Sequence, residues 1–306
     1  MNEELLVGFF LATVRTAIPV LIAAIGETFT ERSGVLNLGL DGIMLAGAFS
    51  AFTVSYFTAN LWLGVMIGIV IGAAMGLLMA FMSVTLKTNQ VINGLMLGIL
   101  SYGLVTFLLR IIFSVSYVSS PHYFSPINVP ILSEIPVLGQ LLFQWNPLTY
   151  LLLTMVPISA FVLYKTTFGL KVRAVGENPE AADIAGINVS LIRYVCIIIG
   201  GIMAALGGVY FSLAYVPIFT EQGLSGWGWI ALALVIFGRW NPWWIFAGSM
   251  MFSFVDALQI RLQYSLGYVI PFQFLGMLPY VLPLVALAIR KKMDSPKSLG
   301  HPYSRE

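Results

Sequence analysis

The chain has 306 residues, of which 59% are hydrophobic and 9% are charged, and its formal net charge at pH 7 is +2. Its mean hydropathy is +0.92. A soluble domain carries about 25% charged residues, so this composition excludes a soluble globular protein and predicts an integral membrane protein. The alternating ten-residue segments of membrane β-barrels are missing, so we expect an all-α membrane protein, a polytopic helical bundle of about eight to ten transmembrane segments.

Nine apolar stretches are candidate membrane spans. In chain order they cover about residues 5–26, 36–57, 61–86, 91–115, 148–164, 194–217, 226–238, 243–260 and 268–289. An odd number of spans places the two ends of the chain on opposite sides of the membrane. Residues 27–41 could alternatively form re-entrant half-helices, and 226–238 is short for a full crossing. The prediction is one transmembrane domain over residues 1–290, followed by a polar tail over 291–306.

The third predicted span carries glycine at every fourth position, at Gly64, Gly68, Gly72 and Gly76. This spacing places the four glycines in one stripe along the helix. Small residues in a stripe let membrane helices pack backbone to backbone, so we expect close helix contacts along this face.

A short sequence match suggests an internal repeat. Phe29-Thr-Glu31 recurs as Phe219-Thr-Glu221, and each copy follows a long apolar span. In a nine-span topology the two copies lie on opposite sides of the membrane. An inverted repeat requires this placement.

A polar stretch, residues 171–193, interrupts the apolar sequence and predicts a short capped helix. Asn178 is a good N-cap, and Pro179 falls at the first helical position, where a missing N–H costs nothing. Gly186 can adopt the left-handed conformation that ends a helix. The predicted helix covers about residues 179–185, which is too short to be stable alone.

This short helix predicts a docking element. Glu177 and Glu180 stand near its N-terminus, where the helix dipole favours negative charge. Ala181, Ala182 and Ala185 predict a face of small side chains that another surface can approach closely. The alternative is an ordinary loop between spans, but such loops rarely combine an N-cap, a first-position proline, an alanine face and a glycine stop.

Lysine and arginine predict the orientation, because cytoplasmic loops are enriched in both. They flank the polar stretch and follow the last predicted span, at Lys165, Lys171, Arg173, Arg193, Arg290, Lys291 and Lys292. The loop over residues 116–147 contains neither. We therefore expect residues 171–193 and the C-terminus in the cytoplasm, and the long loop outside.

Five polar side chains inside predicted spans are candidates for a translocation path: Asn37, Asp41, Asn93, Asp256 and Gln259. Polar groups are costly inside a membrane, so they face the bundle interior and are functional candidates. The spacing of Asn37 and Asp41 predicts one shared helix face. The alternative is structural: such side chains cap broken helices or tie spans together, and Asp256 could neutralise Arg110 or Arg261. We expect the structural role for Glu27, Glu31 and Arg32.

The remaining reactive and aromatic residues indicate no catalytic chemistry. Five tryptophans cluster at the ends of predicted spans and are interpreted as an interfacial belt, at Trp227, Trp229, Trp240, Trp243 and Trp244. His122 and His301 lack metal-ligand spacing, and Cys196 has no second cysteine to pair with. The sequence predicts neither a metal site nor an enzyme.

Several of these segments resemble a known family of membrane proteins. Glu180-Ala181-Ala182, followed by Gly186, resembles the EAA-x3-G coupling loop of ABC importer membrane subunits. The Ile-x-Leu-Pro tail typical of maltose-type permeases is missing. Three longer segments resemble the branched-chain amino acid, ribose and nucleoside permease superfamily, in particular its nucleoside and simple-sugar branch: 31–44, 173–182 and 228–242. The resemblance extends over about residues 5–290.

The resemblance implies the permease subunit of an ATP-driven ABC importer in a bacterial-type inner membrane. It implies partners rather than cofactors: an extracytoplasmic substrate-binding lipoprotein that delivers nucleosides or related simple sugars, a second homologous permease that is usually a different chain, and an ABC ATP-binding subunit that holds ATP and Mg. The chain has no Gly-x4-Gly-Lys-Ser/Thr loop, which fits a separate ATPase. No nucleic-acid partner is expected.

The resemblance also assigns candidate roles to residues of this chain. The residues expected to couple to the ATPase are Glu177, Asn178, Pro179, Glu180, Ala181, Ala182, Ala185 and Gly186. The alternative function is an ion- or proton-coupled secondary transporter of a small polar solute. That mechanism would need a buried ionisable relay, for which Asp41 and Asp256 are the candidates.

Overall fold

A computed structural model gives the fold of the chain. It describes all residues except 1–2, 116, 121, 128–129, 131–132, 134, 136–138, 140, 142, 267–270, 280, 282–294 and 305–306. The described elements are α1 (Glu3–Arg32), α2 (Leu40–Thr58), α3 (Leu61–Ala80), the π-helical turn η1 (Phe81–Thr85), α4 (Gln90–Phe113), β1 (Tyr117–Ser119), α6 (Pro147–Lys165), α7 (Thr167–Glu177), α8 (Pro179–Ile184), α9 (Val189–Tyr210), the π-helical turn η3 (Phe211–Tyr215), β2 (Ile218–Thr220), α10 (Trp227–Phe237), α11 (Pro242–Leu266) and α12 (Phe272–Gly276).

The all-α membrane fold is confirmed. Among the described residues, seven helical segments are long and apolar enough to cross a membrane, and α10, with 11 residues, is shorter. The ninth predicted span, residues 268–289, lies mostly outside the described residues, as do Arg290, Lys291 and Lys292.

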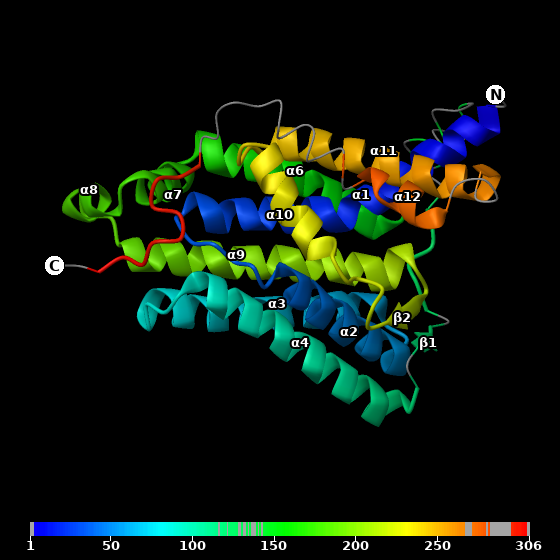
Figure 1. Cartoon of the computed structure of the whole chain (residues 1–306), viewed down its shortest axis with the longest axis horizontal. Helices are drawn as coiled ribbons and strands as arrows, with labels where there is room; N and C mark the ends of the chain where they lie inside the picture. Colours follow the sequence, from blue (N-terminus) through cyan, green and yellow to red (C-terminus); the bar gives the residue numbers. More distant parts are fainter. Residues whose placement is uncertain are drawn as a thin grey trace.

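The long helices lie side by side, and the connecting segments gather at two ends of the bundle (Figure 1). At the α8 end lie α7, α8 and the last described residues. At the opposite end, which we call the β end, β1 and β2 pair antiparallel with Tyr117 opposite Thr220. This two-stranded ribbon, which the sequence analysis did not predict, joins the segment after α4 to the segment after α9. The beginning of α1 also lies at the β end.

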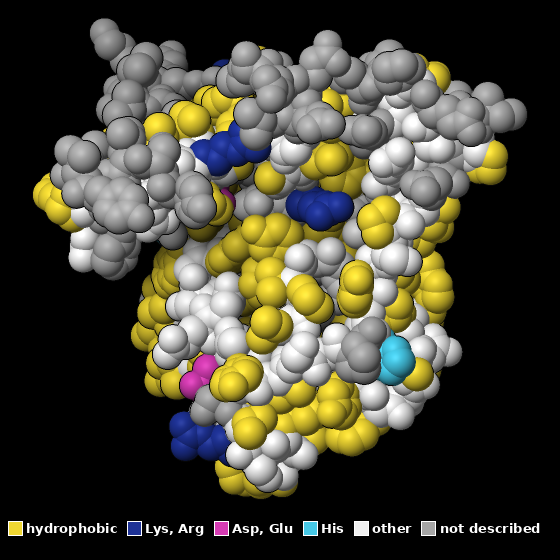
Figure 2. All heavy atoms as spheres, turned by 90° about the vertical axis from the view of Figure 1, so that its right-hand side faces the viewer, with side chains coloured by type: hydrophobic (Ala, Val, Ile, Leu, Met, Phe, Trp, Pro, Cys, Tyr) yellow, Lys and Arg dark blue, Asp and Glu magenta, His cyan; other side chains and the backbone are white. Residues whose placement is uncertain are grey.

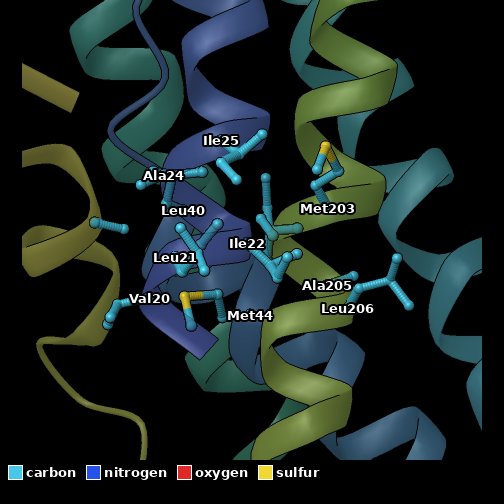
Figure 3. Packing of buried hydrophobic residues seen from close by; sticks show 14 of the residues in the cluster. Val20, Leu21, Ile22, Ala24, Ile25, Leu40, Met44, Met203, Ala205 and Leu206 are labelled. Atoms are coloured by element: carbon cyan, nitrogen blue, oxygen red, sulfur yellow. The ribbon is translucent and has the colours of Figure 1, made fainter. Parts of the chain in front are cut away.

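The core forms where α1, α2 and α9 meet. Leu21 and Ile25 of α1, Met44 of α2 and Met203 of α9 belong to one cluster of buried side chains (Figure 3). These side chains are buried, with at most 6% of their surface exposed. Because α9 also packs closely on α3, it is the central helix of the bundle.

Glycines explain how α9 can touch three neighbours at once. A Cβ on Gly201 would approach Gly76 Cα of α3 to 2.9 Å, and a Cβ on Gly208 would overlap the Met44 carbonyl oxygen of α2. A Cβ on Gly207 would lie 2.5 Å from the Pro19 carbonyl oxygen of α1. Each contact is therefore backbone against backbone, as expected for small residues in membrane helices.

The predicted glycine stripe of α3 is confirmed. Gly64, Gly68, Gly72 and Gly76 are all buried. Gly72 and Gly76 face α9, where a Cβ would approach the Gly201 and Ile197 carbonyl oxygens to 2.6 and 2.9 Å. Gly64 faces α2, because a Cβ there would lie 2.7 Å from the Ala51 carbonyl oxygen.

The predicted end of the first span near residue 26 is wrong, because α1 continues to Arg32. Glu27 and Glu31 remain helical inside the bundle, where both have partners. The Asn37 N–H donates to Glu27 Oε1 over 3.0 Å, and the Trp240 indole N–H donates to Glu31 Oε2. These contacts satisfy one oxygen of each buried carboxyl group, while Glu27 Oε2 has no hydrogen-bond partner among the described residues. They support the structural role expected for this acidic pair.

Two helices begin inside the bundle after a non-helical segment. Residues 33–39 separate α1 from α2, and residues 221–226 separate β2 from α10. The first segment follows one copy of the Phe-Thr-Glu match, and the second begins with Glu221, the last residue of the other copy. The first copy lies in the last turn of α1, toward the α8 end, and the second includes β2 residues at the opposite end. The two copies thus lie at opposite ends of the bundle, as the predicted inverted repeat requires. Because α2 starts at Leu40 rather than at residue 36, a non-helical break separates the first copy from the helix that follows it.

Candidate functional site

The polar stretch folds as two helices joined at Asn178. The first, α7, was not predicted; Thr166 caps it, with its hydroxyl accepting the Gly169 N–H over 3.1 Å. The second, α8, covers Pro179–Ile184, close to the predicted range. The Asn178 side-chain oxygen accepts the Ala181 N–H over 3.0 Å, and Pro179 occupies the first turn. The predicted N-cap is therefore confirmed.

The predicted glycine stop of α8 is confirmed as well. Gly186 has φ +82°, a left-handed conformation that favours glycine. Its N–H donates to the Asp183 carbonyl oxygen over 2.9 Å, and the Ile187 N–H donates to the Ala182 carbonyl oxygen over 3.0 Å. These two bonds form a Schellman motif, which satisfies carbonyl groups at the end of the helix.

The exposed face of α8 differs from the predicted alanine face. Ala182 is only 4% exposed, because it packs into the chain's own core, so it cannot belong to an open docking face. Glu180, Ala181 and Ala185 are exposed. Ile184 is 89% exposed, the most exposed of the large hydrophobic side chains described. The sequence analysis missed Ile184, although an isoleucine on a short polar helix was the available signal.

A second constellation forms where α2, α4 and α10 meet. Asp41, in the first turn of α2, accepts the Gly228 N–H on Oδ1 over 2.8 Å and the Gly226 N–H on Oδ2 over 3.2 Å. The Tyr102 hydroxyl of α4 donates to the same Oδ2 over 2.7 Å. No local side chain caps α10, so Asp41 supplies its N-terminal cap from another helix. The carboxylate also lies near the positive end of both helix dipoles.

An open cavity of about 750 Å³ lies beside Asp41. Its lining includes Tyr102, Phe107 and Arg110 of α4 and Trp229 of α10. The cavity therefore combines aromatic faces with a hydroxyl and a carboxylate. Neutral, hydroxyl-rich solutes can bind such a surface through stacking and hydrogen bonds. Tyr102 and Trp229 were not among the predicted site residues.

Asp41 is the one predicted path residue that this structure places on the cavity wall. Asn37 lies before α2, not on a helix face shared with Asp41, so that prediction is wrong. It is fully buried and its side-chain oxygen accepts the Gly39 N–H over 2.9 Å, forming a local turn. Asn93 is also buried, and its amide donates to Thr88 over 2.8 Å and to Ser83 over 3.2 Å, which ties α4 to η1.

The other two predicted residues lie on α11, which packs mainly on α1. Asp256 is half-buried, and the Gln259 amide donates to Gln263 within the same helix over 3.3 Å. Asp256 and Gln259 thus lie on α11, whereas Asp41 lies where α2, α4 and α10 meet. The five residues predicted from the sequence do not form one site.

The predicted tryptophan belt is wrong for Trp240. This residue is 2% exposed, and its indole N–H is bound to Glu31. Its carbonyl oxygen accepts the Tyr164 hydroxyl over 3.2 Å and the Arg32 Nε–H over 3.4 Å. Through these hydrogen bonds, Trp240 holds the turn between α10 and α11 against the end of α1. Trp243 and Trp244 are exposed, as a belt requires.

Removing the Asp41 carboxylate should destabilise the fold at the start of α10. In Asp41→Leu, the buried N–H of Gly228 and the half-buried N–H of Gly226 lose their acceptor, at a cost of about 1–3 kcal/mol for the buried group. Asp41→Asn retains one acceptor oxygen and should cost less. Thermal unfolding in detergent measures the order of stability, with Asp256→Leu as the control because Asp256 caps no helix in the described structure. Equal losses for Asp41→Leu and Asp256→Leu would contradict the capping role.

The fold resembles a solved inward-facing structure of an ABC transporter provisionally described as metal-chelate type, with a TM-score of 0.50, 15% identity, and coverage of 92% of this chain and 86% of that chain. In sequence, the chain is 35% identical to the guanosine ABC transporter permease protein NupQ of Bacillus subtilis, over 95% of each chain. It is 42% identical to a Haloferax volcanii protein provisionally named glucose ABC transporter permease protein TsgC13, over 84% of this chain and 78% of that protein.

A family model described as branched-chain amino acid transport system / permease component matches residues 9–287. The match covers α1 to α12 and includes both the α8 stretch and the Asp41 junction. The resemblance inferred from the sequence is confirmed, and the chain is a transport subunit and not an enzyme. The chain belongs to the branched-chain amino acid transport system / permease component family of ABC transporter permeases.

Proposed function

We propose that this permease imports nucleosides or related simple sugars, and that α8 is the coupling helix to a separate ATP-binding subunit. The observation that carries the coupling role is the exposure of Ile184, which is 89% exposed on a helix capped at both ends. Burying an isoleucine is favourable by about 1.5–3 kcal/mol, so this side chain suits a partner's groove. The Glu180 carboxylate on the same helix offers a negative charge that can fix the orientation of the partner.

The cytoplasm lies at the α8 end in this proposal. Cationic side chains of the described chain gather there, on or beside elements at this end: Arg32, Lys87, Lys165, Lys171, Arg173, Arg193, Arg239 and Lys297. Figure 2 shows the β end, where most coloured side chains are hydrophobic or uncharged and few are Lys or Arg. This asymmetry is what the positive-inside rule expects. A substrate-binding lipoprotein would then deliver solute at the β end.

The substrate class follows from the cavity beside Asp41 and from the relatives. Trp229 is 49% exposed and offers an aromatic face, while Asp41 and Tyr102 offer hydrogen-bonding groups. Guanosine and glucose, named for two relatives, both carry hydroxyl groups, and guanosine adds a base that can stack. Both are neutral, so neither requires a charged partner in the permease.

The same cavity supports pairing with a second homologous permease, in a heterodimer. The cavity is open, and the neighbouring α4 surface carries large exposed apolar side chains, including Ile99 and Phe107. A second permease packed on this face would enclose the cavity and complete a path between the two subunits. ATP and Mg would be held by the ATP-binding subunit.

Uptake should depend on ATP and not on an ion gradient. We expect proteoliposomes that contain the complete transporter and its binding protein to accumulate labelled guanosine or glucose only when ATP is supplied on the α8 side. A protonophore should leave initial uptake rates unchanged. Uptake that continues without ATP and collapses with the proton gradient would contradict the proposal and favour the secondary-transport alternative.

A further inference from the structure

The last described residues, 295–304, lie against the α8 end of the bundle, beside α7 and the beginning of α9 (Figure 1). We call this segment the C-terminal strap. The Ser298 N–H donates to the Gly176 carbonyl oxygen at the end of α7 over 3.0 Å. The Gly300 N–H donates to the Gly34 carbonyl oxygen, just after α1, over 3.2 Å. The strap is thus hydrogen-bonded to two elements far apart in the sequence.

Gly34 makes room for the strap, and Gly176 makes room for the end of α1 beside it. Gly34 has φ +90°, and a Cβ at this position would overlap Ser298 Oγ. A Cβ on Gly176 would overlap the Arg32 carbonyl oxygen and lie 3.4 Å from Pro296 Cβ. Pro296 and Ser298 are both buried. The strap therefore fits closely over Gly34, and a larger side chain at Gly34 would force it out.

A buried arginine fixes the strap to α9. Arg193, expected from the sequence in a loop, is inside α9 and only 1% exposed. Its Nε–H donates to the Ser33 carbonyl oxygen over 3.2 Å, its Nη1 donates to the His301 carbonyl oxygen over 3.2 Å, and its Nη2 points at Ser298 Oγ over 3.5 Å. A buried guanidinium needs such acceptors. Two of these three belong to the strap.

The strap also holds α8. The Tyr303 hydroxyl donates to Asp183 Oδ2 over 3.0 Å, and Asp183 belongs to α8. The strap therefore connects α8 to the ends of α1 and α9, two of the three helices that form the core in Figure 3. The caps of α8 and the buried Ala182 also hold this helix against the bundle.

We propose that the C-terminal strap transmits the movement of α8 to α1 and α9, with Arg193 and Tyr303 as positioning residues. This inference rests on the proposed coupling role of α8. When a partner moves α8, a connection to the core through Tyr303, Ser298 and Arg193 makes the core move with it. Without the strap, α8 can yield locally, and ATP hydrolysis then moves less solute across the membrane.

The first test concerns docking of the strap and does not depend on transport. Hydrogen exchange on the complete transporter should show protection at the Ser298 and Gly300 amides, since both are hydrogen-bonded. In Arg193→Met these amides should exchange at least about tenfold faster. Lys171→Met is the matched control, because it removes an exposed cation at the same end of the bundle and should leave exchange unchanged.

The second test measures labelled guanosine or glucose transported for each ATP hydrolysed. Tyr303→Phe should lower this ratio by about tenfold or more, the effect of losing one hydrogen bond to a charged group. A chain that ends at residue 294 should lower it further. Tyr123→Phe is the control, because Tyr123 is exposed and follows β1 at the β end.

Three results would overturn the inference. Fast exchange of the strap amides in the unmodified transporter would show that the strap is not docked. An unchanged transport ratio in both Tyr303→Phe and the shortened chain would show that a docked strap positions nothing. Normal uptake by a variant with a charge at Ile184 would remove the coupling role of α8 itself, and the strap would then have no movement to transmit.

Discussion

Replacing Ile184 with aspartate should abolish uptake while leaving the folded permease in the membrane. Ile184 is 89% exposed, so its replacement removes no packing inside this chain. At an interface, truncating a central apolar anchor costs about 2 kcal/mol or more, and burying a carboxylate there adds to that cost. A loss of 2 kcal/mol weakens association about 30-fold. Glu180→Lys, which reverses the neighbouring charge, should act in the same direction.

The measurement compares uptake, ATP hydrolysis and the amount of permease extracted from the membrane. Substrate-stimulated ATP hydrolysis should fall with uptake, and the amount of permease should not change. Ile218→Asp is a matched control: Ile218 is an exposed isoleucine in β2, at the opposite end of the bundle. Normal uptake by Ile184→Asp, or an equal loss of the ATP-binding subunit that co-purifies with the Ile218→Asp control, would contradict the assignment of α8.

Of the substitutions that add a single methyl group, Gly208→Ala should cause the largest loss of stability. The added Cβ would overlap the Met44 carbonyl oxygen, so the backbones of α9 and α2 must move apart. Overpacking of this kind costs about 1–3 kcal/mol, and more where backbone has to shift. We expect earlier thermal unfolding in detergent and less folded protein in the membrane.

Gly103→Ala provides the control for this substitution. Gly103 also lies within a long helix, but nothing lies within 4 Å of a Cβ built on it. Its replacement with alanine should leave stability unchanged or raise it slightly, because alanine favours the helix by about 1 kcal/mol. If both variants unfold at the same temperature, the close contact between α9 and α2 is not what holds the bundle together.

Local patterns predicted much of this fold. Long apolar runs identified the spans, and the regular spacing from Gly64 to Gly76 identified a packing face without any knowledge of its partner. Asn178, Pro179 and Gly186 predicted α8 because capping is decided by neighbouring residues. The helix ends were harder to predict: α1 continues through Glu31 because Trp240, more than two hundred residues away, satisfies that carboxyl group.

The errors at the candidate sites have the same cause, because the positions of these side chains also depend on contacts that local sequence patterns do not show. Periodicity placed Ala182 with the other alanines, but its burial depends on packing against distant parts of the chain. Asn37 and Asp41 had helical spacing, yet the Asn37 side chain forms a turn that delays the start of α2. The contact of Asp41 with Gly228 and the strap's contact with Arg193 join distant segments, and no local pattern predicts such pairs.

The central claim is that a separate ATP-binding subunit contacts this permease at α8, and site-specific photocrosslinking tests it most directly. A photoreactive amino acid placed at Ile184 in the assembled transporter should capture the ATP-binding subunit, and the same group at Ile218 in β2 should not. Capture from position 184, with a yield that changes when ATP binds, is the predicted result. Capture of the ATP-binding subunit from position 218 and not from position 184 would contradict the account.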